Sequence, residues 1–202
     1  TKVLGENEHG VYLLRYRNKL LSNKILIDRY HHQLRLNYTK AIDLEKGRLV
    51  KIKLLKDKIL LAYSSFDRKS QSNSLFMIYY DYELKAIGQP KKIVGVGIQE
   101  FGDRGDFRVR ISDNEEFIGL IYTEKEGPYQ LQYHWQILDK NLQQVTHFDQ
   151  RIPIPRKFFV QQDFMLTDDG QIYGLVREIK EQRAGVREHE DWLLLHRQDT
   201  DL

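Results

Sequence analysis

Short apolar runs separated by polar turns recur along the chain. Three of these runs are rich in β-branched and aromatic residues, and each follows an acidic turn: Lys58–Tyr63, Phe117–Tyr122 and Gln171–Val176. The turn aspartates, Asp57, Asp113 and Asp168, are 56 and 55 residues apart. A further apolar run precedes each turn, at Val50–Leu54, Phe107–Ile111 and Phe159–Leu166. Two β-prone runs joined by a short polar turn predict a hairpin, so the pattern predicts a repeat that opens with one.

A second turn motif follows the third apolar run of each repeat. The third runs are Ile25–Asp28, Phe76–Tyr80, Tyr133–Ile137 and Trp192–His196. The motif reads Asp-x-x-Leu at Asp81–Leu84, Asp139–Leu142 and Asp199–Leu202, and more loosely at His31–Leu34. An aspartate that opens a turn can accept a hydrogen bond from the backbone two residues on, and the leucine restarts the apolar face. The repeat is therefore strand, tight turn, strand, variable loop, strand, Asp-x-x-Leu turn, strand.

Four antiparallel strands per repeat without an intervening helix are typical of a propeller blade. The sequence resembles the β-propeller repeat superfamily, in particular the WD-like repeats of Tol-associated periplasmic propellers, whose blades often carry a Ser-x-Asp-Gly type turn before the second strand. Here the turn reads Ser112-Asp113-Asn114 and Thr167-Asp168-Asp169-Gly170, with weaker forms at Lys56-Asp57-Lys58 and Glu8-His9-Gly10. The terminal Trp-Asp dipeptide is missing, and the repeat is longer than the usual 40 to 45 residues.

The predicted fold is an all-β propeller with antiparallel four-stranded blades near residues 2–45, 46–98, 103–152 and 155–202. The first unit has little room for a strand ahead of Glu8, and the fourth strand of the last unit would begin at Leu202. Because propellers typically have four to eight blades, we expect a portion of a larger propeller. The alternative is a small twisted sheet or a sandwich of hairpins.

Composition narrows the function classes. The 202 residues carry 32 Lys and Arg against 29 Asp and Glu, a formal charge of +3. The net charge is too small to indicate nucleic-acid binding, and residues of both signs are mixed along the chain. The absence of Cys excludes disulfides, thiolate metal sites and a cysteine nucleophile. No apolar run approaches the roughly 20 residues that span a bilayer, so no transmembrane segment is predicted.

Three short motifs are weighed and set aside. The tripeptide Arg104-Gly105-Asp106 could be an adhesion ligand but is expected to be a loop between blades. Gly95-Val96-Gly97 lacks the third glycine and the following helix of a dinucleotide loop. His31 and His32 are adjacent, and on a strand they would point to opposite faces, so they are poorly placed to bind one metal ion. We therefore expect no cofactor and no metal site.

The most charged stretch, Arg177–Asp191, is expected to be a solvated loop between the second and third strands of the last unit, and Ser64–Ser74 the matching polar loop in the second. Within the charged stretch, His189, Glu190 and Asp191 could instead belong to an acid/base or metal site. Dense tyrosines on the third strands, among them Tyr79, Tyr80 and Tyr133, suggest that some rings are exposed. The residues expected to contact a protein partner are Arg177, Lys180, Arg183, Arg187, His189, Glu190, Tyr82 and Tyr129.

The sequence predicts a non-catalytic scaffold that binds another protein, because a propeller presents variable loops from every blade. The resemblance to periplasmic propellers and the absence of Cys indicate the cell envelope or periplasm, with the cytoplasm as the alternative. A second function stays open: a glycoside- or peptide-directed propeller hydrolase with catalytic residues partly outside this segment, for which a glycan is the alternative ligand. A glycan-cleaving propeller would need paired carboxylates.

Overall fold

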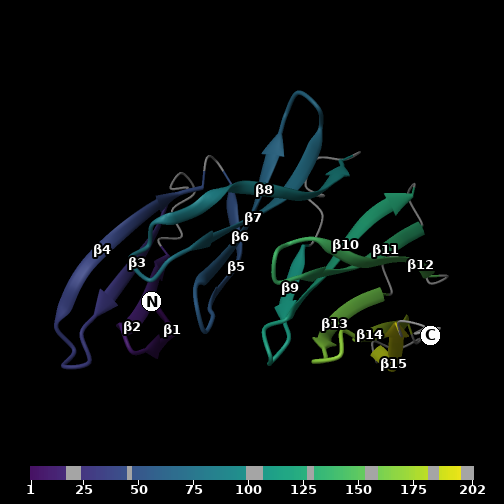
Figure 1. Cartoon of the computed structure of the whole chain (residues 1–202). Coiled ribbons are helices and arrows are strands. Elements are labelled where there is room, and N and C mark those ends of the chain that lie inside the picture. The colour runs from purple at the N-terminus through teal and green to yellow at the C-terminus, as the bar shows by residue number, and fades with distance from the viewer. Residues whose placement is uncertain are drawn as a thin grey trace. The chain divides into compact units, whose positions relative to one another are not determined.

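All regular structure in the described part of the chain is β-strand. The computed structural model describes residues 1–16, 24–44, 47–98, 107–126, 130–152, 159–181 and 187–196. The chain divides into two compact units, Thr1–Arg104 and Gly105–Leu202. Neighbouring strands of each sheet follow one another in sequence and pair antiparallel (Figure 1). No helix in the described residues is long and apolar enough to cross a membrane.

The first unit holds two four-stranded sheets. The first sheet comprises β1 (Lys2–Asn7), β2 (Gly10–Tyr16), β3 (Lys24–Tyr30) and β4 (Leu36–Asp43). The second sheet comprises β5 (Arg48–Leu54), β6 (Ile59–Asp67), β7 (Ser72–Tyr80) and β8 (Ala86–Gly97). Residues 59–64 of β6 are all buried, which explains the continuous apolar run from Ile59 to Tyr63, whereas most of β8 is exposed. Pro90, Lys91 and Lys92 on this edge strand are residues that discourage pairing with another chain.

The second unit holds a four-stranded and a three-stranded sheet among its described residues. The third sheet comprises β9 (Arg108–Ile111), β10 (Phe117–Glu126), β11 (Gln130–Asp139) and β12 (Gln144–Ile152). The fourth sheet comprises β13 (Phe159–Leu166), β14 (Ile172–Glu181) and β15 (Arg187–His196). Each sheet falls inside one of the four residue ranges expected for the blades, and the first three have four strands in the predicted order. The fourth strand expected for the last range lies outside the described residues.

The Asp-x-x-Leu motifs form the turns before β4, β8 and β12. In each, the leucine NH donates to the carbonyl three residues earlier, at 2.8 Å for Leu34, 2.9 Å for Leu84 and 3.0 Å for Leu142. All three leucines have positive φ, between 57° and 62°. The Asp81 carboxylate also accepts from Lys85 N at 2.8 Å, and that of Asp139 from Gln143 N at 2.7 Å. The fourth motif, Asp199–Leu202, lies outside the described residues.

A turn carbonyl links the two sheets of the first unit. The Tyr82 carbonyl, between β7 and β8, accepts from the Tyr12 hydroxyl at 3.0 Å, the Tyr38 hydroxyl at 3.2 Å and Arg29 Nη1 at 3.4 Å. Arg29 also pairs with the Glu83 carboxylate. Beneath this network, apolar side chains of both sheets form one core, with Tyr12, Ile25 and Ile27 from the first sheet fully buried.

The core of the second unit lies between the third and fourth sheets. Its buried residues are Ile121, Tyr133, Trp135, Ile137, Phe164, Leu166, Ile172 and Val176. The Trp135 ring packs directly on the backbone of β14 at Gly174, where a Cβ would come within 2.3 Å of the Trp135 Cη2 atom. Glycine is therefore required at this position by close approach.

Three expectations about element boundaries are wrong. A complete strand, β1, precedes Glu8, since Gly5 and its neighbours pair with β2 across a bulge. Most of Ser64–Ser74 is strand, because the Asp67 carboxylate accepts from Lys69 N at 2.9 Å and Ser70 Oγ at 2.8 Å and so closes a turn at residues 68–71. The charged stretch Arg177–Asp191 also lies largely in strands β14 and β15.

Candidate functional site

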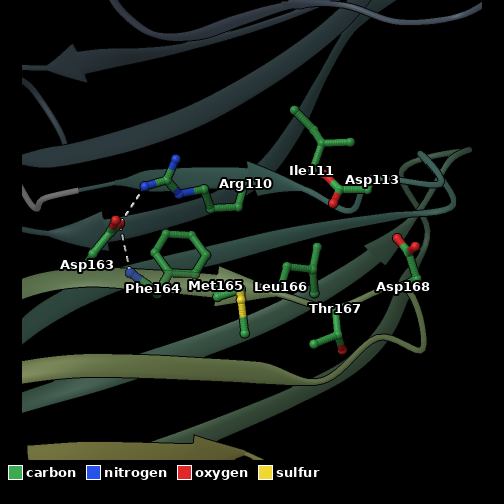
Figure 2. A pocket seen from close by; sticks show the side chains of 9 residues that line it. All are labelled: Arg110, Ile111, Asp113, Asp163, Phe164, Met165, Leu166, Thr167 and Asp168. Atoms are coloured by element: carbon green, nitrogen blue, oxygen red, sulfur yellow. Dashed lines mark hydrogen bonds and ion pairs between the residues drawn. The ribbon is translucent and has the colours of Figure 1, made fainter.

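A groove of about 590 Å³ opens in the second unit and is lined mainly by β9 and β13 with the turns that follow them. These strands belong to different sheets and lie next to one another. The lining residues are Arg110, Ile111, Asp113, Asp163, Phe164, Met165, Leu166, Thr167 and Asp168. Figure 2 shows Arg110 and Asp163 toward one end and the carboxyl groups of Asp113 and Asp168 toward the other.

An ion pair spans the groove at its first end. Arg110 Nη2 lies 2.5 Å from Asp163 Oδ1, which also accepts from Phe164 N at 2.8 Å (Figure 2). The guanidinium stands over the Phe164 ring at 5.8 Å from its centroid. The hydrogen bond from Arg110, reinforced by that from Phe164 N, lowers the pKa of Asp163 below its usual value. Asp163 is therefore ionised at neutral pH.

Both members of this pair remain open to solvent. The Arg110 side chain is 43% exposed and that of Asp163 60% exposed. Met165, between them and the turns, is 56% exposed, whereas Phe164 and Leu166 are buried. The groove thus combines an accessible cation, an accessible anion and a flexible apolar side chain that can adapt to a ligand.

Asp113 and Asp168 lie in the tight turns between the first two strands of their sheets, as predicted. The turns are closed by the residues before them. Ser112 Oγ accepts from Phe117 N at 3.0 Å, and Thr167 Oγ1 accepts from Gln171 N at 2.9 Å. The Asp168 carboxylate does not cap its own turn, because the preceding hydroxyl performs that role.

Asp168 instead connects the two turns. Its Oδ1 atom accepts from Asn114 N at 2.8 Å, and its carbonyl accepts from Asn114 Nδ2 at 3.0 Å. The Asp113 side chain makes no hydrogen bond or ion pair to any other described residue, and it lines the groove. Asp113 is consequently the carboxyl at this end that is available to a ligand.

The residues predicted from sequence to bind a partner lie elsewhere. Tyr82 is half-buried, its hydroxyl donates to Leu55 O at 2.8 Å, and its ring lies 4.8 Å from that of His9. On the β14–β15 hairpin, Arg177 is opposite Asp191, Lys180 opposite Glu188, Arg187 opposite Glu181, His189 opposite Ile179, and Glu190 opposite Glu178. Arg183 and Tyr129 are outside the described residues, as is Arg104-Gly105-Asp106. A role of these residues in binding a partner stays a prediction.

Sequence reasoning missed Arg110 and Asp163, which are 53 residues apart. Each residue lies on the first strand of its repeat, and the two repeats are consecutive. When the repeats are aligned on Asp113 and Asp168, each of these strands lies directly before its turn. The sequence signal that could have identified them is the presence of a charged residue within each of the apolar runs Phe107–Ile111 and Phe159–Leu166.

Comparisons with known proteins identify the fold of the chain. No protein-family model matches the chain, and no curated protein matches it. A solved structure that does match is α-L-arabinanase from Penicillium chrysogenum, in complex with arabinobiose. The TM-score is 0.55 at 12% sequence identity. The match covers 96% of this chain, which spans 63% of the arabinanase chain. The likeness does not bear on the Tol-associated subtype. It shows that this chain of antiparallel sheets has a β-propeller fold.

Proposed function

We propose that the groove between β9 and β13 binds an oligosaccharide, and that the propeller of which it is a part cleaves a glycosidic bond there. The observation that carries the proposal is the grouping of Arg110, Asp163 and Asp113 along one open groove. Sugar hydroxyls both donate and accept hydrogen bonds, so a guanidinium beside carboxylates matches them. The arabinobiose complex of the structurally similar arabinanase supports this class of ligand.

Glycoside hydrolysis uses two carboxyl groups, one that gives a proton to the leaving oxygen and one that acts ionised as base or nucleophile. Asp163 suits the ionised role, because Arg110 keeps its pKa low. We propose Asp113 as the second carboxyl group, because it lines the same groove and its side chain has no other partner among the described residues. Asp168 is a positioning residue, since its carboxylate holds the backbone of Asn114 next to Asp113.

The scaffold role, a protein partner and the location in the cell envelope are not addressed by the fold or by the comparisons. They remain proposals from the sequence. The hydrolase hypothesis is preferred here because it has two supports, the groove chemistry and the structural neighbour, whereas the scaffold hypothesis has none beyond the variable loops.

The test uses the full-length protein with a panel of oligosaccharides that includes arabino-oligosaccharides. Binding is measured by calorimetry and hydrolysis by release of reducing ends. We expect Asp113→Asn and Asp163→Asn to reduce hydrolysis by about 100-fold or more, the range for loss of an acid or base. Asp57→Asn is the matched control, because Asp57 occupies the corresponding turn in the first unit.

Circular dichroism establishes that each variant is folded. Arg110→Ala separates recognition from chemistry, because it should weaken oligosaccharide binding as well as hydrolysis. A full-length protein that binds none of the panel contradicts the proposal, as does hydrolysis that survives both aspartate substitutions. Binding without hydrolysis by the unaltered protein removes the catalytic part and leaves a carbohydrate-binding propeller.

A further inference from the structure

Two histidines and an aspartate meet on one face of the third sheet, away from the groove residues. His134 lies on β11, and His147 and Asp149 lie two residues apart on β12. His134 and Asp149 are direct cross-strand partners. One potential ligand atom from each of the three side chains lies within 4.8 Å of the other two.

A single carboxylate oxygen is shared by both imidazoles. Asp149 Oδ1 is 2.6 Å from His134 Nδ1 and 3.0 Å from His147 Nε2. The two rings are nearly parallel, with an interplanar angle of 10° and centroids 6.0 Å apart. The Tyr122 ring stacks on the His134 ring, with centroids 4.6 Å apart. Stacking holds the plane of the His134 ring, and within that plane the contact with Asp149 places Nδ1 toward the carboxylate.

The other nitrogen of His134 has no hydrogen bond. His134 Nε2 is buried and unpaired, although Glu124 Oε2 lies 3.4 Å away. If the ring proton is on Nδ1, facing Asp149, then Nε2 presents a lone pair toward a carboxylate. A cation bound at Nδ1 would place the ring proton on Nε2 instead, and Glu124 could accept it. This carboxylate–histidine–metal arrangement is the usual outer support of a metal-bound histidine.

We infer that His134 Nδ1, His147 Nε2 and the Asp149 carboxylate form a binding site for a divalent transition-metal cation of the Zn²⁺ type. Two imidazoles and one carboxylate are a ligand set that suits Zn²⁺. Tetrahedral bonds of about 2.0–2.1 Å put ligand atoms about 3.3 Å apart. Asp149 Oδ1 therefore has to move away from each nitrogen by less than 1 Å, and the two nitrogens, which lie within 4.8 Å of each other, have to approach by at most about 1.5 Å.

The exposure of the three side chains matches an accessible site. That of His134 is 9% exposed, whereas those of His147 and Asp149 are 35% and 44% exposed. The two exposed ligands can adjust, and a water molecule can take the fourth position. The inference is independent of the proposed oligosaccharide site, because no residue is shared between the two.

The test uses the full chain after removal of any affinity tag and dialysis against a chelator. Zn²⁺ is titrated in competition with a chromophoric chelator, and the visible absorption of bound Co²⁺ reports the coordination number. We expect one Zn²⁺ per chain and four-coordinate Co²⁺. His147→Ala and Asp149→Asn should each weaken Zn²⁺ binding by about 100-fold, and Glu124→Gln by about 10-fold.

The matched control is a His31→Ala/His32→Ala double variant, which removes two exposed histidines that lack this geometry. It should bind Zn²⁺ like the unaltered protein. His134 is not substituted, because its buried ring is part of the sheet packing. Zn²⁺ should also raise the melting temperature of the unaltered protein and leave that of Asp149→Asn unchanged.

The inference is overturned if the unaltered chain binds no stoichiometric Zn²⁺, or if both His147→Ala and Asp149→Asn bind it equally well. The three side chains would then be a hydrogen-bonded group in which Asp149 serves only as an acceptor for two imidazoles.

Discussion

The carboxylate of Asp168 accepts a hydrogen bond from the backbone NH of Asn114, which lies in the corresponding turn of the preceding sheet, at 2.8 Å. The contact joins two copies of the same turn from successive repeats. It also fixes the end of the groove at which Asp113 lies. The turns before β10 and β14 are thereby coupled, although each is closed by its own hydroxyl residue.

Asp168→Ala should lower the free energy of unfolding by about 1 kcal/mol, because the hydrogen bond to Asn114 N is lost. Asp57→Ala, at the equivalent place in the first unit, is the control. Equilibrium denaturation in urea measures both. Equal effects of the two substitutions would show that the contact between turns contributes nothing.

Gly174→Ala should destabilise the second unit by about 1–3 kcal/mol, because the added methyl group overlaps the buried Trp135 ring. Thermal unfolding and tryptophan fluorescence measure the effect. Leu175→Ala is the control, since Leu175 is the next residue along β14 and is 39% exposed. A Gly174→Ala protein as stable as the control would contradict the packing of Trp135 on β14.

Leu34 and Leu84 form a natural pair for separating backbone strain from burial. Both occupy the last position of the Asp-x-x-Leu turn or its His31 variant with φ near 58°, but Leu34 is 74% exposed and Leu84 is fully buried. Leu34→Gly should change stability by less than about 1 kcal/mol, because glycine relieves a left-handed conformation at some cost in entropy. Leu84→Gly should cost about 2–5 kcal/mol through loss of core contacts.

Chemical denaturation of the two variants measures this difference. Comparable losses for Leu34→Gly and Leu84→Gly would contradict the assignment of Leu84 to the core.

Asp28 should make the first unit sensitive to acid. Its side chain is only 3% exposed, and it accepts from Arg15 Nη2 at 2.7 Å and from Thr39 Oγ1 at 2.6 Å. These hydrogen bonds, chiefly that from Arg15, lower the pKa of Asp28 in the folded state. The ionised carboxylate therefore adds stability above the unfolded pKa of about 3.9, and this is lost as pH falls through the lower folded pKa.

Asp28→Asn should reduce stability at pH 7 by about 1.5–3 kcal/mol, the range for hydrogen bonds to a charged group, and should flatten the decline below about pH 4. Urea denaturation at a series of pH values measures both effects. Asp43→Asn, on the exposed end of β4, is the control. Parallel pH profiles for Asp28→Asn and the unaltered protein would contradict the prediction.

The strands and turns could be predicted from the sequence where a local motif determines them. The Asp-x-x-Leu motif fixes its turn through backbone hydrogen bonds of the motif itself, so Asp81 and Asp139 could be placed without knowledge of the fold. Arg177–Asp191 misled the interpretation because charge is typical of both solvated loops and exposed strands. The strands are identified by their backbone pairing, which places Arg177 opposite Asp191 and Lys180 opposite Glu188.

The candidate functional residues depend on packing between sheets and on irregular register. Arg110 and Asp163 meet only because the first strands of two sheets lie together, which no local pattern encodes. His134 presents a different difficulty. A regular hairpin closed by Asp139 and Gln143 would place His134 opposite Phe148, whereas the bulge at Ile137 and Leu138 places it opposite Asp149. A bulge of one residue shifts the cross-strand pairing beyond it by one position, which changes the residues that lie opposite one another. The position of this bulge could not be predicted from the sequence.

The Tyr82 carbonyl has a consequence for recombining propeller repeats. A blade can be exchanged alone only where its neighbours lose no specific partner. Here, Tyr12, Arg29 and Tyr38 of the first sheet all donate to the Tyr82 carbonyl of the second. Removing the second sheet would leave these donors without that acceptor, and removing the first would leave the carbonyl without these donors. The first two repeats therefore form one transferable module, and a chimaera should be joined after β8 rather than between β4 and β5.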